Sequence, residues 1–200
     1  MQKIITVFQR NYDTDRLVRN EVVPGAEWVL AGEGVATRKW DGACCMVRHG
    51  QLFKRLELKA GKIAPLDFEP IQPPDAVTGA IPGWVPIGEG PEDQWFRNAI
   101  GQLICPDGTY EAIGPHFGGG HHCKNPEGCA TDLLVRHGPA ELPAFPRMFE
   151  RMRDYFLNMG RDASTGASIE GVVFHHPDGR MAKIKARDFG VKRPESRQRT

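Results

Sequence analysis

Two stretches in the first third of the chain have the residue pattern of β-strands. They are residues 43–48 and 52–58, and His49, Gly50 and Gln51 lie between them. Short apolar runs on either side of a turn that contains glycine predict a β-hairpin. The glycines at 32 and 34 predict a loop that leads the chain toward this hairpin.

Further along, the pattern predicts two more strands and one clear helix. The strands are 109–114, which ends at glycine and proline, and 130–136. The helix is expected over 146–159, because Pro146 suits a first helical turn and Gly160 a helix end. Apolar residues recur along it at helical spacing and are expected to face the core. They are Met148, Phe149, Met152, Phe156 and Met159.

The segment 61–109 holds eight of the sixteen prolines. Such a density predicts irregular surface structure, with one short helix at 91–100. Because strand-like segments resume after it, this segment is expected to interrupt a domain rather than to separate two.

A second hairpin is predicted near the C-terminus. Residues 169–176 and 181–187 are strand-like, and the sequence Pro-Asp-Gly at 177–179 favours a turn between them. Alternation with a period of two puts Lys183 and Lys185 on one face of the second strand.

The chemistry of this hairpin depends on its register. With the expected loop of two or four residues, an even-numbered residue pairs with an odd-numbered one, and Glu170 lies on the same face as Lys183 and Lys185. Buried charges need partners or a ligand, so the patch predicts a polyphosphate site in which lysines contact phosphate oxygens and the carboxylate holds Mg²⁺. A solvent-facing hairpin with a cross-strand ion pair explains the same residues.

Composition limits the class of protein. The chain has 200 residues, enough for one domain with a real core, and its 26% charged and 40% hydrophobic residues are ordinary for a globular protein. No apolar run approaches the ~20 residues of a membrane span and the N-terminus has no signal-peptide core, so we expect a cytoplasmic protein without membrane contact. The five cysteines, an odd number that includes adjacent Cys44 and Cys45, fit a reducing compartment.

Charge is unevenly distributed, although the net value is only +1. From Arg180 to Thr200 eight lysines and arginines stand against Asp188 and Glu195, a local charge of +6. A basic end predicts contact with a polyanion such as a nucleotide or a nucleic acid. From Lys192 onward a solvated basic tail explains the charges equally well.

One short stretch carries the most specific chemistry, Thr37-Arg38-Lys39-Trp40-Asp41-Gly42. Its lysine is expected on the loop that enters the first hairpin, and is a candidate covalent nucleophile once the amine has lost its proton. Burial and nearby cations favour that loss, and Lys183 and Lys185 are such cations. Gly42 lacks a side chain and lets a ligand approach the backbone. Taken alone, Lys-x-Asp-Gly also fits an ordinary surface lysine at a turn.

Four short motifs, in this order, resemble motifs I, III, IV and V of the covalent nucleotidyltransferases, which include ATP-dependent DNA ligases, RNA ligases and mRNA capping enzymes. They are Lys39-Trp-Asp-Gly42, Tyr110-Glu-Ala-Ile-Gly114, Ile169-Glu-Gly-Val-Val173 and Lys183-Ile-Lys185. Longer matches at 39–45, 110–114, 134–138 and 170–176 resemble the compact 5′-3′ RNA ligase family known from animals. The resemblance runs from about Thr37 to Pro194.

The resemblance implies a fold and a reaction. The fold is a mixed α+β, ATP-grasp-like adenylation domain of antiparallel sheets with flanking helices, formed by residues 1–200 as a single domain. In the reaction Lys39 attacks the α-phosphorus of ATP, expels pyrophosphate and holds AMP as a phosphoramide. AMP then passes to an RNA 5′-phosphate, and a 3′-OH displaces it to seal the strand. ATP, Mg²⁺ or Mn²⁺, and RNA ends are the implied cofactors and partners.

The resemblance also implies roles residue by residue. Asp41 helps in the nucleic-acid steps, Arg55 contacts the ribose or a phosphate, and Glu111 hydrogen-bonds the ribose. Glu170 holds the metal. Val173 stacks on the base, although strict alternation puts it on the face opposite Glu170 unless the strand bulges. The other implied nucleotide-binding residues are Thr37, Arg38, Gly42, Lys183 and Lys185.

Other functions remain open at this point. DNA ligases and capping enzymes carry an oligonucleotide-binding barrel after motif V, and the chain leaves no room for one, so RNA ligation is favoured over capping with GTP and over DNA nick sealing. An alternative from another class is a module that binds nucleotides or RNA ends without chemistry.

Two groups of histidines and cysteines are candidates for further roles. His121, His122, Cys123 and Cys129 are zinc-ligand types, but Cys-x5-Cys is not a usual zinc spacing and the glycines at 118–120 predict a loop. His137, His175 and His176 are expected at strand ends as structural or solvent-facing residues. His137 also lies in one of the family-like stretches and is a candidate contact to nucleotide or RNA.

Overall fold

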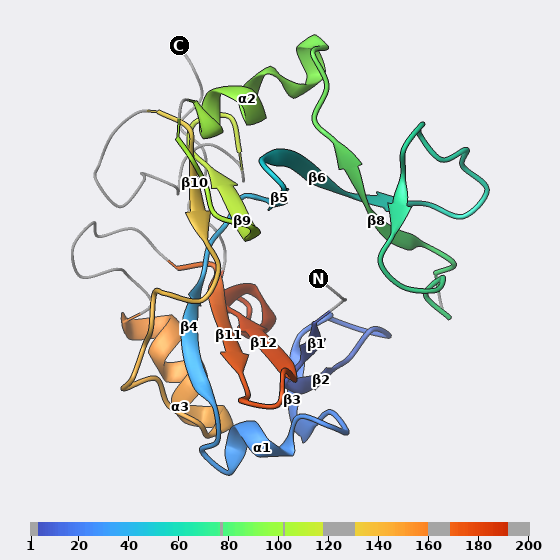
Figure 1. Cartoon of the computed structure of the whole chain (residues 1–200). Helices are drawn as coiled ribbons and strands as arrows, with labels where there is room; N and C mark the ends of the chain where they lie inside the picture. Colours follow the sequence, from blue (N-terminus) through green and yellow to red (C-terminus); the bar gives the residue numbers. More distant parts are fainter. Residues whose placement is uncertain (1–3, 77, 102, 118–130, 160–168, 192–200) are drawn as a thin grey trace, which may run out of the picture. The chain divides into compact units, whose positions relative to one another are not determined.

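The structure is a computed structural model that describes residues 4–76, 78–101, 103–117, 131–159 and 169–191 (Figure 1). Contacts divide the described chain into two compact units. We call Asp41–His137 the inserted unit, and Ile4–Trp40 together with 138–191 the flanking unit. That residues 1–200 act as a single domain stays a prediction.

A four-stranded sheet forms the centre of the flanking unit. Its strands, in spatial order, are β1 (Ile5–Thr6), β12 (Met181–Lys185), β11 (Gly171–His175) and β4 (Val35–Lys39). β1 pairs with β12 in parallel, and the other neighbours pair antiparallel. In Figure 1, β4 in light blue lies beside β11 in orange-red, although they come from opposite ends of the chain.

The hairpin of β11 and β12 confirms the strand prediction, but the predicted register is wrong. Even-numbered residues pair with even-numbered ones, as Val172 does with Ile184, and odd with odd, as Val173 does with Lys183. The connection runs from His176 to Arg180, an odd number of residues, whereas a loop of even length was expected. The backbone N–H of His176 donates to the carbonyl of Arg180 at 2.9 Å and closes this longer loop.

The register gives the sheet one buried face and one polar face. In β4, β11 and β12 the residues that pack into the hydrophobic core are even-numbered, and odd-numbered residues occupy the opposite face. The buried residues are Ala36, Val172, Phe174, Ala182 and Ile184. The residues of the polar face include Thr37, Lys39, Val173, His175, Lys183 and Lys185.

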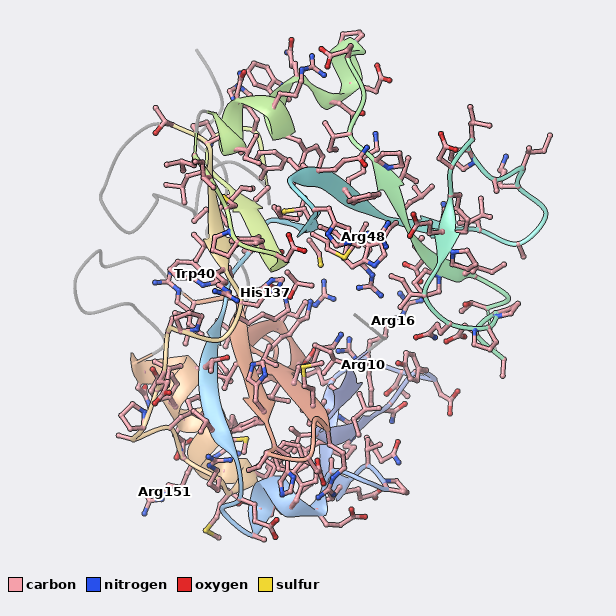
Figure 2. All side chains as sticks on the ribbon, in the orientation of Figure 1. Arg10, Arg16, Trp40, Arg48, His137 and Arg151 are labelled. Carbon is pink, nitrogen blue, oxygen red and sulfur yellow. The ribbon has the colours of Figure 1, made fainter. Side chains whose placement is uncertain are left out.

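Helix α3 (Phe149–Asp154) and the π-helical segment η2 (Tyr155–Met159) pack against the buried face. Met152 and Phe156 are buried in the core, as the apolar stripe predicted. The helix begins at Phe149 rather than Pro146, because the preceding Met148 has extended backbone. Met148 is therefore exposed, and its predicted core position is wrong. Arg151 of α3 points outward to solvent (Figure 2).

Shorter elements complete the flanking unit: β2 (Phe8–Arg10), β3 (Val18–Val22), α1 (Glu27–Leu30) and the 3₁₀ turn η3 (Ala186–Phe189). Asp188 in η3 is wholly buried. Its carboxylate accepts a hydrogen bond from the backbone N–H of Lys185 at 2.9 Å and pairs with the guanidinium of Arg10. This pair holds the end of β12 against β2.

The inserted unit contains a six-stranded antiparallel sheet. Its strands, in spatial order, are β10 (Leu133–Arg136), β9 (Gly108–Ile113), β5 (Ala43–Arg48), β6 (Gln51–Leu58), β8 (Ile81–Pro86) and β7 (Glu69–Pro70). β5 and β6 confirm the first predicted hairpin. Its turn residues His49 and Gly50 both have positive φ, 52° and 75°, as a two-residue hairpin turn requires.

Strand β9 confirms the prediction at 109–114, and β10 is shorter than the strand predicted at 130–136. The 3₁₀ turn η1 (Pro91–Asp93) and helix α2 (Gln94–Ile100) confirm the short helix predicted at 91–100. Strands β7 and β8 also lie in the proline-rich segment, so the prediction of irregular structure there was only partly right.

The core of the inserted unit joins α2 to one face of its sheet, with Cys45 and Tyr110 buried beside Ala99. Asp93 is buried, accepts a hydrogen bond from the Gly88 N–H at 2.9 Å and pairs with Lys54 of β6. This buried ion pair ties the helix to the sheet.

The described residues therefore form a mixed α+β protein with mainly antiparallel sheets, which confirms the predicted class. None of its described helices is both long and apolar enough to span a bilayer.

Candidate functional site

Lys39 is the last residue of β4, so the prediction that it lies on a loop is wrong. It stands opposite Gly171 of β11. On the other edge of β4, the Arg38 N–H donates to the Ala140 carbonyl at 2.7 Å. The backbone that carries Lys39 is thus held from both sides by segments remote in sequence.

The carboxylate of Glu170 joins two lysines. Its Oε2 accepts a hydrogen bond from Lys39 Nζ at 2.6 Å, and its Oε1 accepts one from Lys185 Nζ at 2.6 Å. The side chain of Glu170 is only 7% exposed, and those of Lys39 and Lys185 are 20% and 15% exposed. We call these three residues the lysine–glutamate cluster.

A glycine allows Glu170 to reach Lys185. Glu170 precedes the first residue of β11, so strand alternation does not fix the direction of its side chain. A Cβ on Gly171 would lie 2.3 Å from the Ile184 carbonyl oxygen and 2.8 Å from the Lys185 Cα. Only glycine permits this close approach of β12. Glu170 and Lys185, which were predicted to share a face with Lys183, are therefore in contact, but through a different register.

The cluster changes the pKa values of two of its members. Burial alone would raise the pKa of Glu170, but the ammonium groups of Lys39 and Lys185 outweigh burial and hold the pKa below its ordinary value. Burial lowers the pKa of Lys185, and the nearby charge of Lys39 lowers it further, while Glu170 opposes the change. Glu170 is thus an anion at neutral pH, and Lys185 loses its proton more readily than a surface lysine.

A row of residues crosses the polar face beside the cluster. Lys183 lies opposite Val173, and Val173 opposite Thr37. Val173 therefore shares the face of the lysines without a bulge. The buried Thr37 hydroxyl donates to the Val173 carbonyl at 3.2 Å and lies 3.0 Å from Nε2 of His175. His175 ends β11, as the predicted strand-end position requires, but its contact with Thr37 was not predicted.

Arg38 is the exception among the residues predicted around Lys39. It lies opposite Val172 on the other face of β4, and its guanidinium carbon is 4.1 Å from the centre of the Trp40 ring. The structure thus brings Thr37, Lys183 and Lys185 to the face of Lys39 but does not bring Arg38 there.

Four predicted site residues belong to the inserted unit: Asp41, Gly42, Arg55 and Glu111. A Cβ on Gly42 would lie 2.1 Å from the Ala112 carbonyl oxygen, so packing against β9 already requires glycine there without a ligand. Arg55 lies opposite Trp84, and its buried Nε has no hydrogen-bond partner among the described residues.

Glu111 lies in a cluster that the sequence did not predict. Its Oε2 is 3.0 Å from His137 Nε2, and His137 Nδ1 is 3.1 Å from the Thr109 hydroxyl. Cys44 stands opposite Glu111 on β5. Strand alternation predicts that Thr109 and Glu111 share one face of β9. It does not predict which strands pair with β9, so the contacts of Glu111 with His137 and Cys44 could not be predicted from the sequence.

The lysine–glutamate cluster offers an amine as a nucleophile, a carboxylate for a cation and a second ammonium for phosphate oxygens. The histidines and cysteines predicted to be a weak metal candidate at 121–129 lie outside the described residues. Comparison of the sequence with protein-family models found no match, and comparison with curated proteins found none either.

Proposed function

We propose that the protein is an ATP-dependent RNA ligase that joins RNA 5′-phosphate and 3′-OH ends through a lysyl-AMP at Lys39. The carrying observation is the buried carboxylate of Glu170, held 2.6 Å from the ammonium groups of both Lys39 and Lys185. Partly buried lysines around one carboxylate are an expensive arrangement for structure alone, because desolvating each charge costs free energy. A ligand with several negative charges would pair with these lysines and offset the cost of their desolvation.

The first chemical step forms one bond and breaks one. Lys39 Nζ, once deprotonated, forms a bond to the α-phosphorus of ATP, and the bond from that phosphorus to the bridging oxygen of pyrophosphate breaks. Pyrophosphate leaves with the electron pair, and the amine proton passes to solvent or to the leaving group. Lys185 stabilises the charge that develops on the phosphate oxygens. Lys183, two residues away on the same strand face, supplies a second positive charge.

Glu170 is the residue that would hold a divalent cation. One carboxylate together with substrate phosphates is a usual donor set for Mg²⁺, and Mn²⁺ accepts the same oxygens, so the residue type fits. Both oxygens of Glu170 accept hydrogen bonds from lysines in this structure, so a cation would have to displace one of the two lysines. A cation at Oε2 would release the Lys39 amine from its ion pair. Bound Mg²⁺ supplies charge neutralisation on the leaving pyrophosphate.

The later steps transfer AMP to RNA. An oxygen of the RNA 5′-phosphate attacks the phosphorus of lysyl-AMP, the N–P bond breaks, and Lys39 is regenerated. A 3′-OH then attacks the activated 5′-phosphate and AMP leaves. We assign the nucleotidyltransferase fold to the chain, and the mixed α+β sheets are compatible with that fold. Asp41 remains the residue predicted to help in the nucleic-acid steps, and Arg55 and Glu111 remain predicted contacts to the nucleotide.

The test is an intact-mass spectrum after incubation with ATP and Mg²⁺. We expect the mass to rise by one AMP in the native protein. Lys39→Arg keeps the charge beside Glu170 but removes the nucleophilic amine, so it should give no adduct. Lys62→Ala, at an exposed position, is the matched control and should be adenylylated like the native protein.

The same spectrum separates the other functions. An adduct with GTP and none with ATP would move the assignment to a capping-type guanylyltransferase. Nucleotide binding without any adduct, in protein free of preloaded AMP, would indicate a binding module.

A separate sealing assay tests the preference for RNA. Equal sealing rates on matched nicked RNA and nicked DNA would remove the RNA preference.

A further inference from the structure

The inserted unit holds a second cluster of reactive side chains, and we propose that Cys44, Glu111 and His137 form a binding site for a zinc-type transition-metal ion. One ligand atom from each residue lies within 4.8 Å of the other two. Ligand atoms around a tetrahedral Zn²⁺ stand about 3.4–3.6 Å apart, given metal–ligand distances of about 2.0–2.3 Å. Small side-chain rotations therefore suffice to close the site.

The backbone brings these side chains together from three neighbouring strands. Cys44 of β5 is directly opposite Glu111 of β9, and β10 pairs on the other side of β9 and delivers His137 just after its last residue. Figure 2 shows the His137 side chain at this end of β10. Two of the three residues are thus fixed by sheet register and the third by the end of a paired strand, which makes the site rigid rather than a chance meeting of surface groups.

The surroundings of His137 match those of a metal-bound histidine. Its Nδ1 is 3.1 Å from the Thr109 hydroxyl, and Nε2 faces the Glu111 carboxylate at 3.0 Å. Metal-ligating histidines almost always donate their second ring N–H to an oxygen, which leaves the other nitrogen as the ligand. In that tautomer Nε2 and the carboxylate are both acceptors, and a cation between them resolves their repulsion.

The ligand types indicate which ion would bind. Thiolate, imidazole and carboxylate together suit Zn²⁺ or Co²⁺ and are unlike the all-oxygen sites that Mg²⁺ prefers. Three protein ligands leave a fourth position for water or another molecule. The adjacent Cys45 is not an alternative ligand, because its side chain is wholly buried in the core of the inserted unit.

The metal site uses Glu111, which is also the predicted ribose contact, but metal binding does not require the ligase proposal, so its test uses no ligation readout. The test is a titration of the full-length protein with Co²⁺, followed by optical absorption. We expect one strong site per chain with a thiolate-to-Co²⁺ charge-transfer band in the near ultraviolet and tetrahedral bands in the visible. Zn²⁺ should displace Co²⁺ and abolish both.

Variants assign the site to its residues. Cys44→Ser should lose the charge-transfer band, and His137→Gln should weaken Co²⁺ binding at least about tenfold. Cys105→Ser, a free cysteine outside the cluster, should bind like the native protein. Circular dichroism of each metal-free variant separates loss of ligand from loss of fold. If Cys44→Ser proves unfolded, a folded His137→Gln must instead need at least about tenfold more Co²⁺ than the native protein to develop the band.

Two outcomes would overturn the proposal. One is the absence of a Co²⁺ thiolate band in the reduced native protein. The other is a band that persists in folded Cys44→Ser but disappears when His121, His122, Cys123 and Cys129 are replaced together, which would assign the metal to that stretch.

Discussion

At the scale of single residues, the chemistry of the flanking unit depends on Glu170. One buried carboxylate balances two ammonium groups, so removing it leaves both lysines without their shared counter-ion. Breaking a buried pair costs more than the pair contributes, because the remaining charges stay desolvated. Replacing Glu170 is therefore expected to affect both the stability of the fold and the proposed reaction.

This gives a prediction with a defined pH dependence. The folded pKa of Glu170 lies below 4.5, so its contribution to stability is present above that pH and is lost as pH falls through the lower folded value. Glu170→Gln should lower the free energy of unfolding by about 2–3 kcal/mol at pH 7. The difference from the native protein should shrink at pH 3, because that pH lies below the ordinary pKa of 4.5, so the carboxyl of the unfolded chain is largely protonated there.

Denaturant unfolding at both pH values measures this difference. The exposed Glu57→Gln is the control and should change stability by less than about 0.5 kcal/mol. A Glu170→Gln deficit of the same size at pH 3 and pH 7 would contradict the electrostatic explanation.

At the scale of elements, the hairpin of β11 and β12 is the part that positions the cluster. The strands approach so closely at Gly171 that no Cβ fits between them. The register then places the lysines of β12 opposite β11 residues on the polar face and leaves the even-numbered residues in the core. A change in strand spacing is therefore expected to move Lys185 away from Glu170.

Gly171→Ala tests this dependence. The added methyl group must displace the backbone of β12, which should destabilise the protein by about 2 kcal/mol and reduce Lys39 adenylylation at a temperature where the variant is still folded. Gly88→Ala is the matched control, because its Cβ would meet only Asp93 Oδ2 at an ordinary 3.7 Å. Full adenylylation of folded Gly171→Ala would show that this spacing does not matter to the site.

At the scale of the whole molecule, the inserted unit interrupts the sequence of the flanking unit. Among the described residues, the core of the flanking unit consists of residues from its own two segments. Those segments are joined near the interruption, since Arg38 N–H donates to the Ala140 carbonyl at 2.7 Å and Thr37 bridges to Glu141. The two ends that an excision would create are therefore close together.

We predict that the flanking unit folds without the inserted one. A chain in which residues 1–40 are joined to 138–200 through about four Gly/Ser residues should give a dispersed amide spectrum and cooperative unfolding. Its denaturant m-value should be smaller than that of the full chain, because less surface is exposed on unfolding. As a control, Phe174→Ala in the excised chain should abolish cooperativity, since Phe174 is wholly buried. A collapsed excised chain without dispersed signals would contradict the prediction.

The sequence by itself determined the elements whose signals are local. Alternation and turn residues predicted both hairpins, and the helical stripe predicted the burial of Met152 and Phe156. It also placed Glu170 on one face with Lys183 and Lys185, but the contact with Lys185 arises through a different register. Such features follow from neighbours a few residues apart, which is why a single sequence reveals them.

Only the tertiary structure decided the arrangements that join distant segments. The loop from His176 to Arg180 has an odd number of residues, so the register of β11 and β12 differs from the predicted one. Because β4 pairs with β11, Lys39 is the last residue of a strand rather than a loop residue. The Cys44, Glu111 and His137 cluster needed three strands in one register. Which strands pair, and how many residues a loop contains, depend on the packing of the whole chain, so local periodicity in the sequence does not predict them.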